Sequence, residues 1–247
     1  MNRRYTGDIR DLFKIDLAIH LMKEVPALEN FTFVPMLTEG EPGAGSRKRR
    51  AKAGANGGAK KDLAAAVAKK RAGSRNTGLV RQMKRLQEIN SDTEYFRAIH
   101  DIFDNEKILI RILEEPAFSH ANRDAYFNSL FLSFPEKSLI FLDPDTGLET
   151  KNPTKRHLLF NEVKRVYDRM DRKSVLMIYQ HFPRVIREGY VKRRCAELEQ
   201  YTGTHPLSVT DNEIVFFLLV KDTGLKTALE EAIASYMDPY PALLVLQ

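Results

Sequence analysis

The sequence predicts an α/β fold: a Rossmann-like, doubly wound and mostly parallel sheet with a C-terminal antiparallel hairpin and helices on both faces. Segments with helical periodicity alternate with short apolar runs along most of the chain, which is typical of parallel sheets. Two runs, 138–143 and 174–179, are apolar almost throughout, as strands buried on both faces are. Four residues separate the last two strands, so we expect those strands to pair antiparallel.

Each predicted element rests on a local pattern. In the first helix, residues 8–24, Leu12, Ile15, Ile19 and Met22 fall on one face, and Pro26 ends the helix. The other predicted helices span 77–90, 92–103, 122–133, 157–171, 187–201 and 225–237. The other predicted strands span 31–36, 107–112, 205–209 and 214–220.

The positive charge is concentrated in one segment. Residues 47–75 hold eleven Lys and Arg against one acid, Asp62, and because the whole chain carries +6, the remaining residues carry about −4. The segment is low in complexity and buries little apolar surface. We therefore expect a single domain over 1–247 with a mobile basic insertion at about 40–76, containing at most a transient helix at 61–72. Deleting 47–75 is then expected to leave the fold intact.

The basic insertion has two interpretations. It is either solvated charge or a set of phosphate contacts that would bring the protein to nucleic acid without reading its sequence. The second interpretation assigns nucleic-acid contacts to six side chains: Arg47, Lys48, Arg49, Arg50, Lys60 and Lys61.

Composition excludes several classes of site. The single cysteine, Cys195, rules out an intramolecular disulfide and a Cys-based zinc site. No two histidines have metal-ligand spacing, so no zinc site is predicted. There is no serine nucleophile elbow and no Gly-Lys phosphate loop. No apolar run is long enough to span a membrane, and no signal-peptide core follows the N-terminus, so we expect a soluble, cytoplasmic protein without a membrane partner.

Polar residues follow the two most apolar strands. Asp143 and Asp145 follow the first, and His181 follows the second. Ligands of open parallel sheets bind outside the carboxyl ends of the strands, so we expect these candidate catalytic residues at one sheet edge, on adjacent strands. No helix N-terminus or Arg partner for Asp143 is evident, which favours a carboxylate kept for a ligand. The alternatives are a structural turn through Gly147 and a histidine at the core edge.

Two motifs resemble a known family. Tyr5-Thr-Gly-Asp-Ile-Arg-Asp-Leu-Phe-Lys14 is similar to the His-Ala-Gly-Asn-x-Ala-Asp-x-x-Lys-His segment that opens the large-ribosomal-RNA adenine-N6 methyltransferases. Asp143-Pro144 stands where amino-methyltransferases carry Asp/Asn-Pro-Pro-aromatic after their fourth strand. Class I methyltransferase domains also insert their last strand antiparallel. The resemblance implies an S-adenosylmethionine cofactor near Lys14, a target amine bonded to Asp143, and Tyr5 and Thr6 approaching the active site.

The sequence departs from that family at two places. Asp145-Thr146 replaces Pro-aromatic, which removes the ring that would stack on a flipped base. The cofactor-binding glycine motif can only be Glu41, Gly43 and Gly45, where glycine would permit close backbone approach to the cofactor. The alternative for these three residues is the start of a flexible loop.

Three functions follow from these residues. The leading one is an S-adenosylmethionine-dependent methyltransferase acting on the amino group of a nucleic-acid base. The second is a Mg²⁺-dependent nuclease using Asp143, Asp145 and Glu149, with Lys151 steadying the attacking hydroxide. The third is a non-catalytic nucleic-acid or protein binder on a degenerate methyltransferase scaffold.

Overall fold

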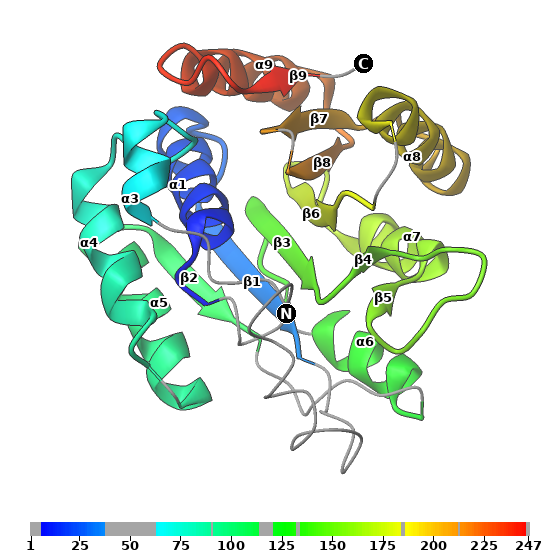
Figure 1. Cartoon of the computed structure of the whole chain (residues 1–247). Coiled ribbons are helices and arrows are strands. Elements are labelled where there is room, and N and C mark those ends of the chain that lie inside the picture. The colour runs from blue at the N-terminus through cyan, green and yellow to red at the C-terminus, as the bar shows by residue number, and fades with distance from the viewer. Residues whose placement is uncertain are drawn as a thin grey trace.

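The computed structural model describes residues 6–37, 63–89, 91–113, 121–131, 134–183, 186–211 and 213–245. Within them, a seven-stranded sheet has the order β2-β1-β3-β6-β8-β7-β9 (Figure 1). The strands are β1 (Asn30–Met36), β2 (Leu109–Ile112), β3 (Ser138–Pro144), β6 (Val175–His181), β7 (Leu207–Thr210), β8 (Ile214–Val220) and β9 (Leu244–Val245). β2, β1, β3 and β6 pair in parallel, and β8 lies antiparallel between β6 and β7. The mostly parallel sheet and its C-terminal hairpin are confirmed.

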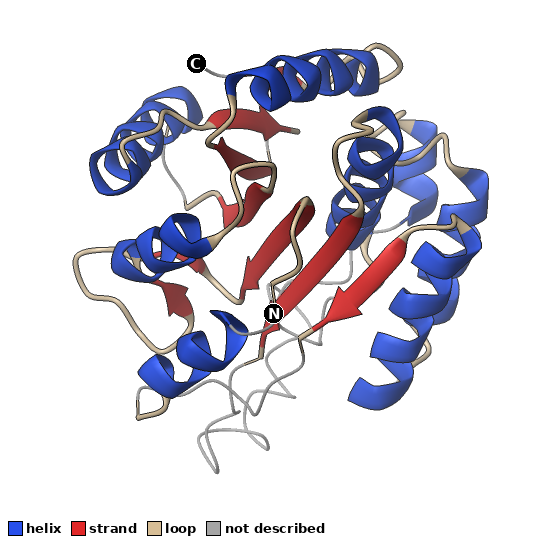
Figure 2. Ribbon diagram, turned by 180° about the vertical axis from the view of Figure 1, so that it is seen from behind, coloured by secondary structure: helices blue, strands red, loops and turns tan. Residues whose placement is uncertain are grey.

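Helices cover both faces of the sheet (Figure 2). One apolar cluster joins the sheet to α1 (Ile9–Glu24), α4 (Thr77–Leu86), α5 (Asp92–Asn105) and α9 (Thr223–Met237). The other joins it to α6 (Arg123–Phe131), α7 (Phe160–Arg169) and α8 (Arg187–Thr202). Both clusters are buried, so the domain has one sheet between two helical layers, as the alternating sequence pattern predicts.

The side chains of the central strands alternate between these two layers. In β3, Leu139 and Phe141 pack with α1, whereas Ile140 and Leu142 pack with α7 and α8. The period of two continues to the strand end, so Asp143 faces the α1 layer. The same parity in β6 directs Tyr179 and His181 toward α1 and Gln180 toward α8. The two-residue alternation along each strand, called strand parity below, therefore decides whether a polar side chain at the strand end meets α1 or α8.

The strand order places a topological switch point between β1 and β3. From β1 the chain moves outward to β2 and then returns to the other side of β1 as β3. The connections on either side of β1 consequently leave in opposite directions, and ligands bind in the crevice that this opens at the carboxyl ends of the strands. Asp143 pairs with Pro35 at that end, directly beside the switch point.

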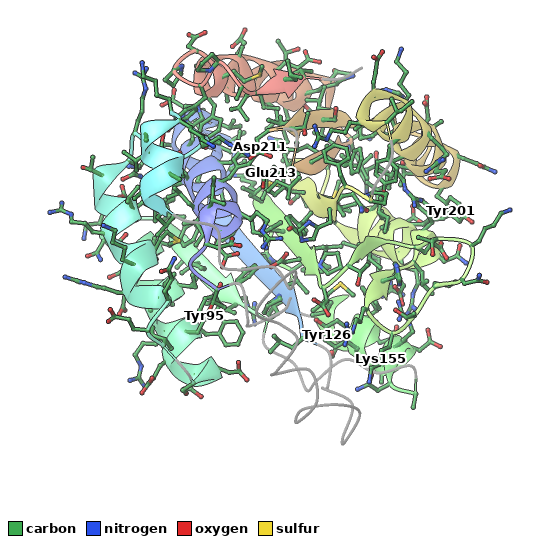
Figure 3. The ribbon with its side chains drawn as sticks, viewed as in Figure 1. Tyr95, Tyr126, Lys155, Tyr201, Asp211 and Glu213 are labelled. Atoms are coloured by element: carbon green, nitrogen blue, oxygen red, sulfur yellow. The ribbon has the colours of Figure 1, made fainter. Side chains whose placement is uncertain are left out.

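The end of the basic segment was predicted wrongly. Residues 63–76 pack into the domain: α3 (Leu63–Ala68) buries Leu63 and Ala66, and Ala72 is also buried. Arg71 binds Asp211 at 2.7 Å and Glu213 at 3.1 Å, and Figure 3 shows these two acids together beside the β7–β8 turn. Deletion of 47–75 would remove these contacts, so we now expect that deletion to destabilise the fold.

Three short strands were not predicted, and they change one boundary. β4 (Gly147–Leu148) pairs in parallel with β5 (His157–Leu158), and β9 pairs with β7. Because His157 and Leu158 are in β5, α7 begins at Phe160 and not at 157. The other helices and strands lie within a few residues of their predicted ranges. None of the described helices is long and apolar enough to cross a membrane.

Packing of the 63–76 segment can be tested at Gly73. Its φ of +78° is left-handed, and a Cβ there would lie 2.8 Å from Leu12 Cγ. Gly203 has a φ of +72° but nothing within 4 Å of such a Cβ, so it is the matched control. We expect Gly203→Ala to cost about 1 kcal/mol of unfolding free energy and Gly73→Ala about 2 to 3 kcal/mol, measured by urea unfolding. Equal costs would show that the segment does not pack against α1.

Candidate functional site

A cavity of about 220 Å³ opens at the carboxyl ends of β3 and β6, beside the switch point. We name it the edge cavity; its central residues are Asp11 and Lys14 of α1, Asp143 of β3, and Tyr179 and His181 of β6. β3 and β6 are adjacent and parallel. The prediction that Asp143 and His181 lie at one sheet edge on neighbouring strands is therefore confirmed.

A buried ion pair forms the floor of the edge cavity. Lys14 Nζ lies 2.9 Å from Asp143 Oδ1, 3.1 Å from Asp143 Oδ2 and 3.3 Å from Asp11 Oδ1. It also stands 3.9 Å from the centre of the Tyr179 ring. Asp143 is 1% exposed and Lys14 is 7% exposed. The sequence shows no Arg or helix N-terminus as a partner for Asp143, but α1 supplies a lysine, 129 residues earlier in the chain.

One ammonium group therefore serves two carboxylates. Burial alone would lower the pKa of Lys14, but the charges of Asp143 and Asp11 raise it above its ordinary value, so the amine stays protonated. Burial raises the pKa of Asp11 to about 6, although Lys14 opposes this shift. Two carboxylates against one ammonium give these three groups a net negative charge. Protonation of Asp11 partly neutralises that charge as the pH falls toward 6.

His181 is a neutral imidazole with a defined tautomer. Its Nε2 lies 3.2 Å from Arg10 Nη1 and 2.8 Å from the Tyr179 hydroxyl oxygen. A guanidinium can only donate, so Nε2 accepts and the ring proton is on Nδ1. Burial lowers the pKa of His181 to about 4, and the charges of Arg10 and Lys14 act in the same direction. His181 can consequently donate a hydrogen bond through Nδ1, but its basic nitrogen is already occupied.

The N-terminal motif shapes the start of α1. Asp8 caps the helix by accepting from the backbone N–H of Arg10 at 2.8 Å, and it also binds the Arg10 guanidinium at 2.6 Å. Gly7 donates its N–H to Asp11 Oδ2 at 2.9 Å. Gly7 has a φ of +72°, and a Cβ there would lie 2.5 Å from the Met83 carbonyl oxygen. The Gly-Asp-x-x-Asp-x-x-Lys spacing therefore fixes Asp11 and Lys14 in the first turns of the helix.

The turn after β3 is held by Gln180. Its Oε1 accepts from the Leu148 N–H at 2.7 Å, and its Nε2 donates to the His181 carbonyl. Gly147 has a φ of +105°, and a Cβ there would lie 2.5 Å from the Gln180 amide. Glycine is required by both the backbone conformation and this close approach. The turn is thus structurally fixed, and it also carries site residues.

The acids of the nuclease hypothesis do not converge. Asp145 lies in the edge cavity but pairs with Arg156 at 3.5 Å. Glu149 Oε1 accepts from the backbone N–H of Phe160 at 2.7 Å, at the start of α7. Over the described ranges, no three His, Cys, Asp or Glu side chains are grouped as metal ligands. The geometry gives no support to a site built from Asp143, Asp145 and Glu149.

Other predicted residues lie outside the described residues. These are the candidate cofactor residues Glu41, Gly43 and Gly45, together with the basic residues Arg47, Lys48, Arg49, Arg50, Lys60 and Lys61, and Tyr5 of the N-terminal motif. Thr6 is described and buried.

Three site residues were missed from the sequence. Asp11 and Arg10 belong to the N-terminal motif but were given no role, and Tyr179 was treated as part of a strand. Strand parity was the available signal for Tyr179, because it places residues 179 and 181 on the same face. Comparison of the chain with protein-family models, curated proteins and solved structures gave no match.

The lowered pKa of His181 can be tested by the pH dependence of folding. The unfolded chain takes up a proton near pH 6.5, whereas the folded chain does so only near pH 4. The unfolded state therefore binds more protons in this window, and stability is lost as the pH falls through it. The unfolding free energy would be measured with urea at about pH 7 and at about pH 4.5. Between these two pH values the unsubstituted protein should lose on the order of 2 kcal/mol more of its unfolding free energy than His181→Gln does.

His100→Gln is the control for this experiment, because His100 is an exposed residue of α5. It should follow the unsubstituted protein at both pH values. A His181→Gln variant that does the same would show that His181 is not held neutral by the fold.

Proposed function

We propose that the protein is an S-adenosylmethionine-dependent methyltransferase that acts on the amino group of a nucleic-acid base. The observation that carries this proposal is the position of Asp143: a buried carboxylate at the switch point of a doubly wound sheet, at the floor of a cavity. Such a carboxylate can hold an amine, and this location is where ligands of the fold bind.

The sheet order supports the same class of protein. The last long strand, β8, lies antiparallel between β6 and β7, which otherwise run in the direction of the other major strands. This insertion is the feature of class I methyltransferase domains that distinguishes them from many other α/β folds. It supports the fold side of the proposal, while the chemistry depends on the residues of the edge cavity.

Asp143 is the acceptor that the reaction needs. When it is ionised, a carboxylate only accepts hydrogen bonds. Lys14 donates to both of its oxygens and so holds the carboxylate in one orientation toward an N–H of the target amine. Accepting from that amine would orient its nitrogen lone pair and stabilise the positive charge that develops on it. Lys14 fixes the carboxylate, and the Nδ1–H of His181 is a donor at the same strand edge.

The charge of the edge cavity suits a cationic cofactor. Four carboxylates line it, from Asp8, Asp11, Asp143 and Asp145, against three cations, from Arg10, Lys14 and Arg156. The surplus arises because Lys14 is shared by Asp11 and Asp143. S-adenosylmethionine would supply a methyl carbon attached to a positively charged sulfonium. The residues present therefore fit this group, with Asp11 providing the complementary charge while Asp143 is left to the target amine.

The basic segment supports the choice of partner. Arg47, Lys48, Arg49, Arg50, Lys60 and Lys61 are close together in a sequence that otherwise carries a net negative charge. Such a segment would contact phosphates and would make the affinity for nucleic acid depend steeply on salt.

Asp143→Asn tests the proposed role of the carboxylate. It keeps the shape of the side chain and one acceptor but removes the charge. We expect S-adenosylmethionine to bind with a dissociation constant within about threefold of the original, measured by calorimetry. Transfer of a labelled methyl group to single-stranded RNA or DNA should fall by at least about a hundredfold, because Asp143 acts on the amine.

Asp168→Asn is the matched control. Asp168 is half exposed on α7 and pairs with Lys164 at the surface. It should leave binding and transfer unchanged. The proposal would be contradicted by an unsubstituted protein that does not bind S-adenosylmethionine, or by an Asp143→Asn variant that transfers methyl groups at the original rate.

A further inference from the structure

A second and larger cavity lies on the other face of the sheet. We name it the aromatic cavity; its rings are Phe160 of α7, Phe182 after β6, and Tyr190 and Tyr201 of α8. Its volume is about 800 Å³, which is within the range of small-molecule sites. Tyr201 is on the α8 side of the molecule, across the sheet from α1 (Figure 3).

The two cavities meet at the sheet edge. Thr146 and His181 line both of them. Strand parity explains this arrangement: Asp143 and Tyr179 face α1, Gln180 faces α8, and the residues at the strand ends border both faces. A ligand that occupied both cavities would pass these two residues.

The aromatic cavity carries the opposite charge to the edge cavity. Its cations come from Lys151, Arg193 and Arg194, against the two carboxylates of Glu149 and Glu197. Glu149 is already bonded to a helix N–H. Lys151 and Arg193 are exposed, so they can approach a bound anion without a large loss of hydration. The cavity thus combines aromatic faces with a positive rim.

Arg194 is a buried cation with unused hydrogen-bonding capacity. It is 4% exposed, and its Nη1 donates to Glu197 Oε2 at 2.7 Å. Its Nε is buried and has no hydrogen-bond partner among the described residues. The guanidinium carbon lies 5.7 Å from the Phe160 ring centre and 5.2 Å from that of Tyr190. An unpartnered buried donor costs free energy, which a ligand acceptor would recover.

We infer that the aromatic cavity binds a nucleotide, with its base on the aromatic side chains and its phosphate at Arg193, Arg194 and Lys151. Bases of every kind stack on aromatic side chains, and Arg and Lys pair with phosphate. The positive cavity would take the phosphate, and the negative edge cavity would take the amino group of the base. Nucleotides of adenine, cytosine and guanine have both groups together with a ring that stacks.

This inference also accounts for the ring that is missing after Asp143. The sequence has Asp145-Thr146 where amino-methyltransferases have Pro-aromatic. Phe182 and Tyr190 lie on the next strand connection and the following helix, with ring centres 5.8 Å apart. We assign to them the stacking role that the turn itself cannot supply. The identification of this nucleotide as the methyl acceptor rests on the proposed function, whereas nucleotide binding by the aromatic cavity does not.

Arg193→Ala tests the site, with Lys192→Ala as its control. Both residues are exposed cations of α8, but only Arg193 lines the cavity, while Lys192 faces Glu188. Binding of a fluorescein-labelled single-stranded RNA would be measured by anisotropy without S-adenosylmethionine present. Binding of adenosine 5′-monophosphate would be measured by its competition with that strand. We expect the nucleotide to weaken the binding of the strand, which would keep its contacts with the basic segment. Arg193→Ala should weaken the affinity for the strand and for the nucleotide by about tenfold each. It should also reduce the salt dependence of the affinity for the strand by about one phosphate contact. Lys192→Ala should change neither by more than about twofold.

Equal effects of the two substitutions would overturn the inference, because they would indicate general surface attraction. So would a strand whose affinity for the protein is the same with and without saturating adenosine 5′-monophosphate. Binding of the nucleotide but not of the strand would support the site and identify a free nucleotide as its ligand. Loss of S-adenosylmethionine binding with nucleotide binding intact would reject the proposed function and leave this site standing.

Discussion

The arrangement of the site depends on the buried ion pair between Lys14 and Asp143. It joins the first helix to the central strand that ends at the switch point, and it sets the depth of the edge cavity. Removing two charges from water costs several kcal/mol for each ion, so the pair needs further partners. Asp11 and the face of Tyr179 provide them. Buried pairs of this kind can often be replaced by apolar residues without loss of stability. This favours a ligand-binding reason for keeping the pair over a stability reason.

The second constraint is the two-residue period of the strands. Because neighbouring side chains point to opposite faces, the ends of β3 and β6 direct Asp143, Tyr179 and His181 to the edge cavity and Gln180 to the aromatic cavity. The helices then determine the charge: α1 surrounds Lys14 with acids, and α8 contributes arginines and tyrosines. Two cavities of opposite charge thus meet at the sheet edge, and a nucleotide has an amine and a phosphate to match them.

Periodicity was sufficient to predict most of the fold, because the strands are long apolar runs and α1 has a regular apolar face. It also predicted that Asp143 and His181 share an edge. The partner of Asp143 was not evident, since pairing across 129 residues depends on how α1 packs on the sheet. Residues 63–76 were misjudged because average composition hides a few anchors, here Leu63, Arg71 and Ala72. β4, β5 and β9 contain two residues each, too few to show a period.

The most direct test of the central claim replaces the ion pair by apolar residues and follows stability and ligand binding together. Lys14→Met alone leaves Asp143 buried without its cation and should cost about 3 to 5 kcal/mol of unfolding free energy. Because Lys14 also serves Asp11, the compensating change includes Asp11→Asn, which keeps an acceptor for the Gly7 N–H. The triple variant Lys14→Met/Asp11→Asn/Asp143→Leu should return to within about 1 kcal/mol of the original protein, yet transfer no methyl group from S-adenosylmethionine to nucleic acid. A triple variant as unstable as the single one, or one that still transfers methyl groups, would contradict the claim that the pair is kept for the ligand.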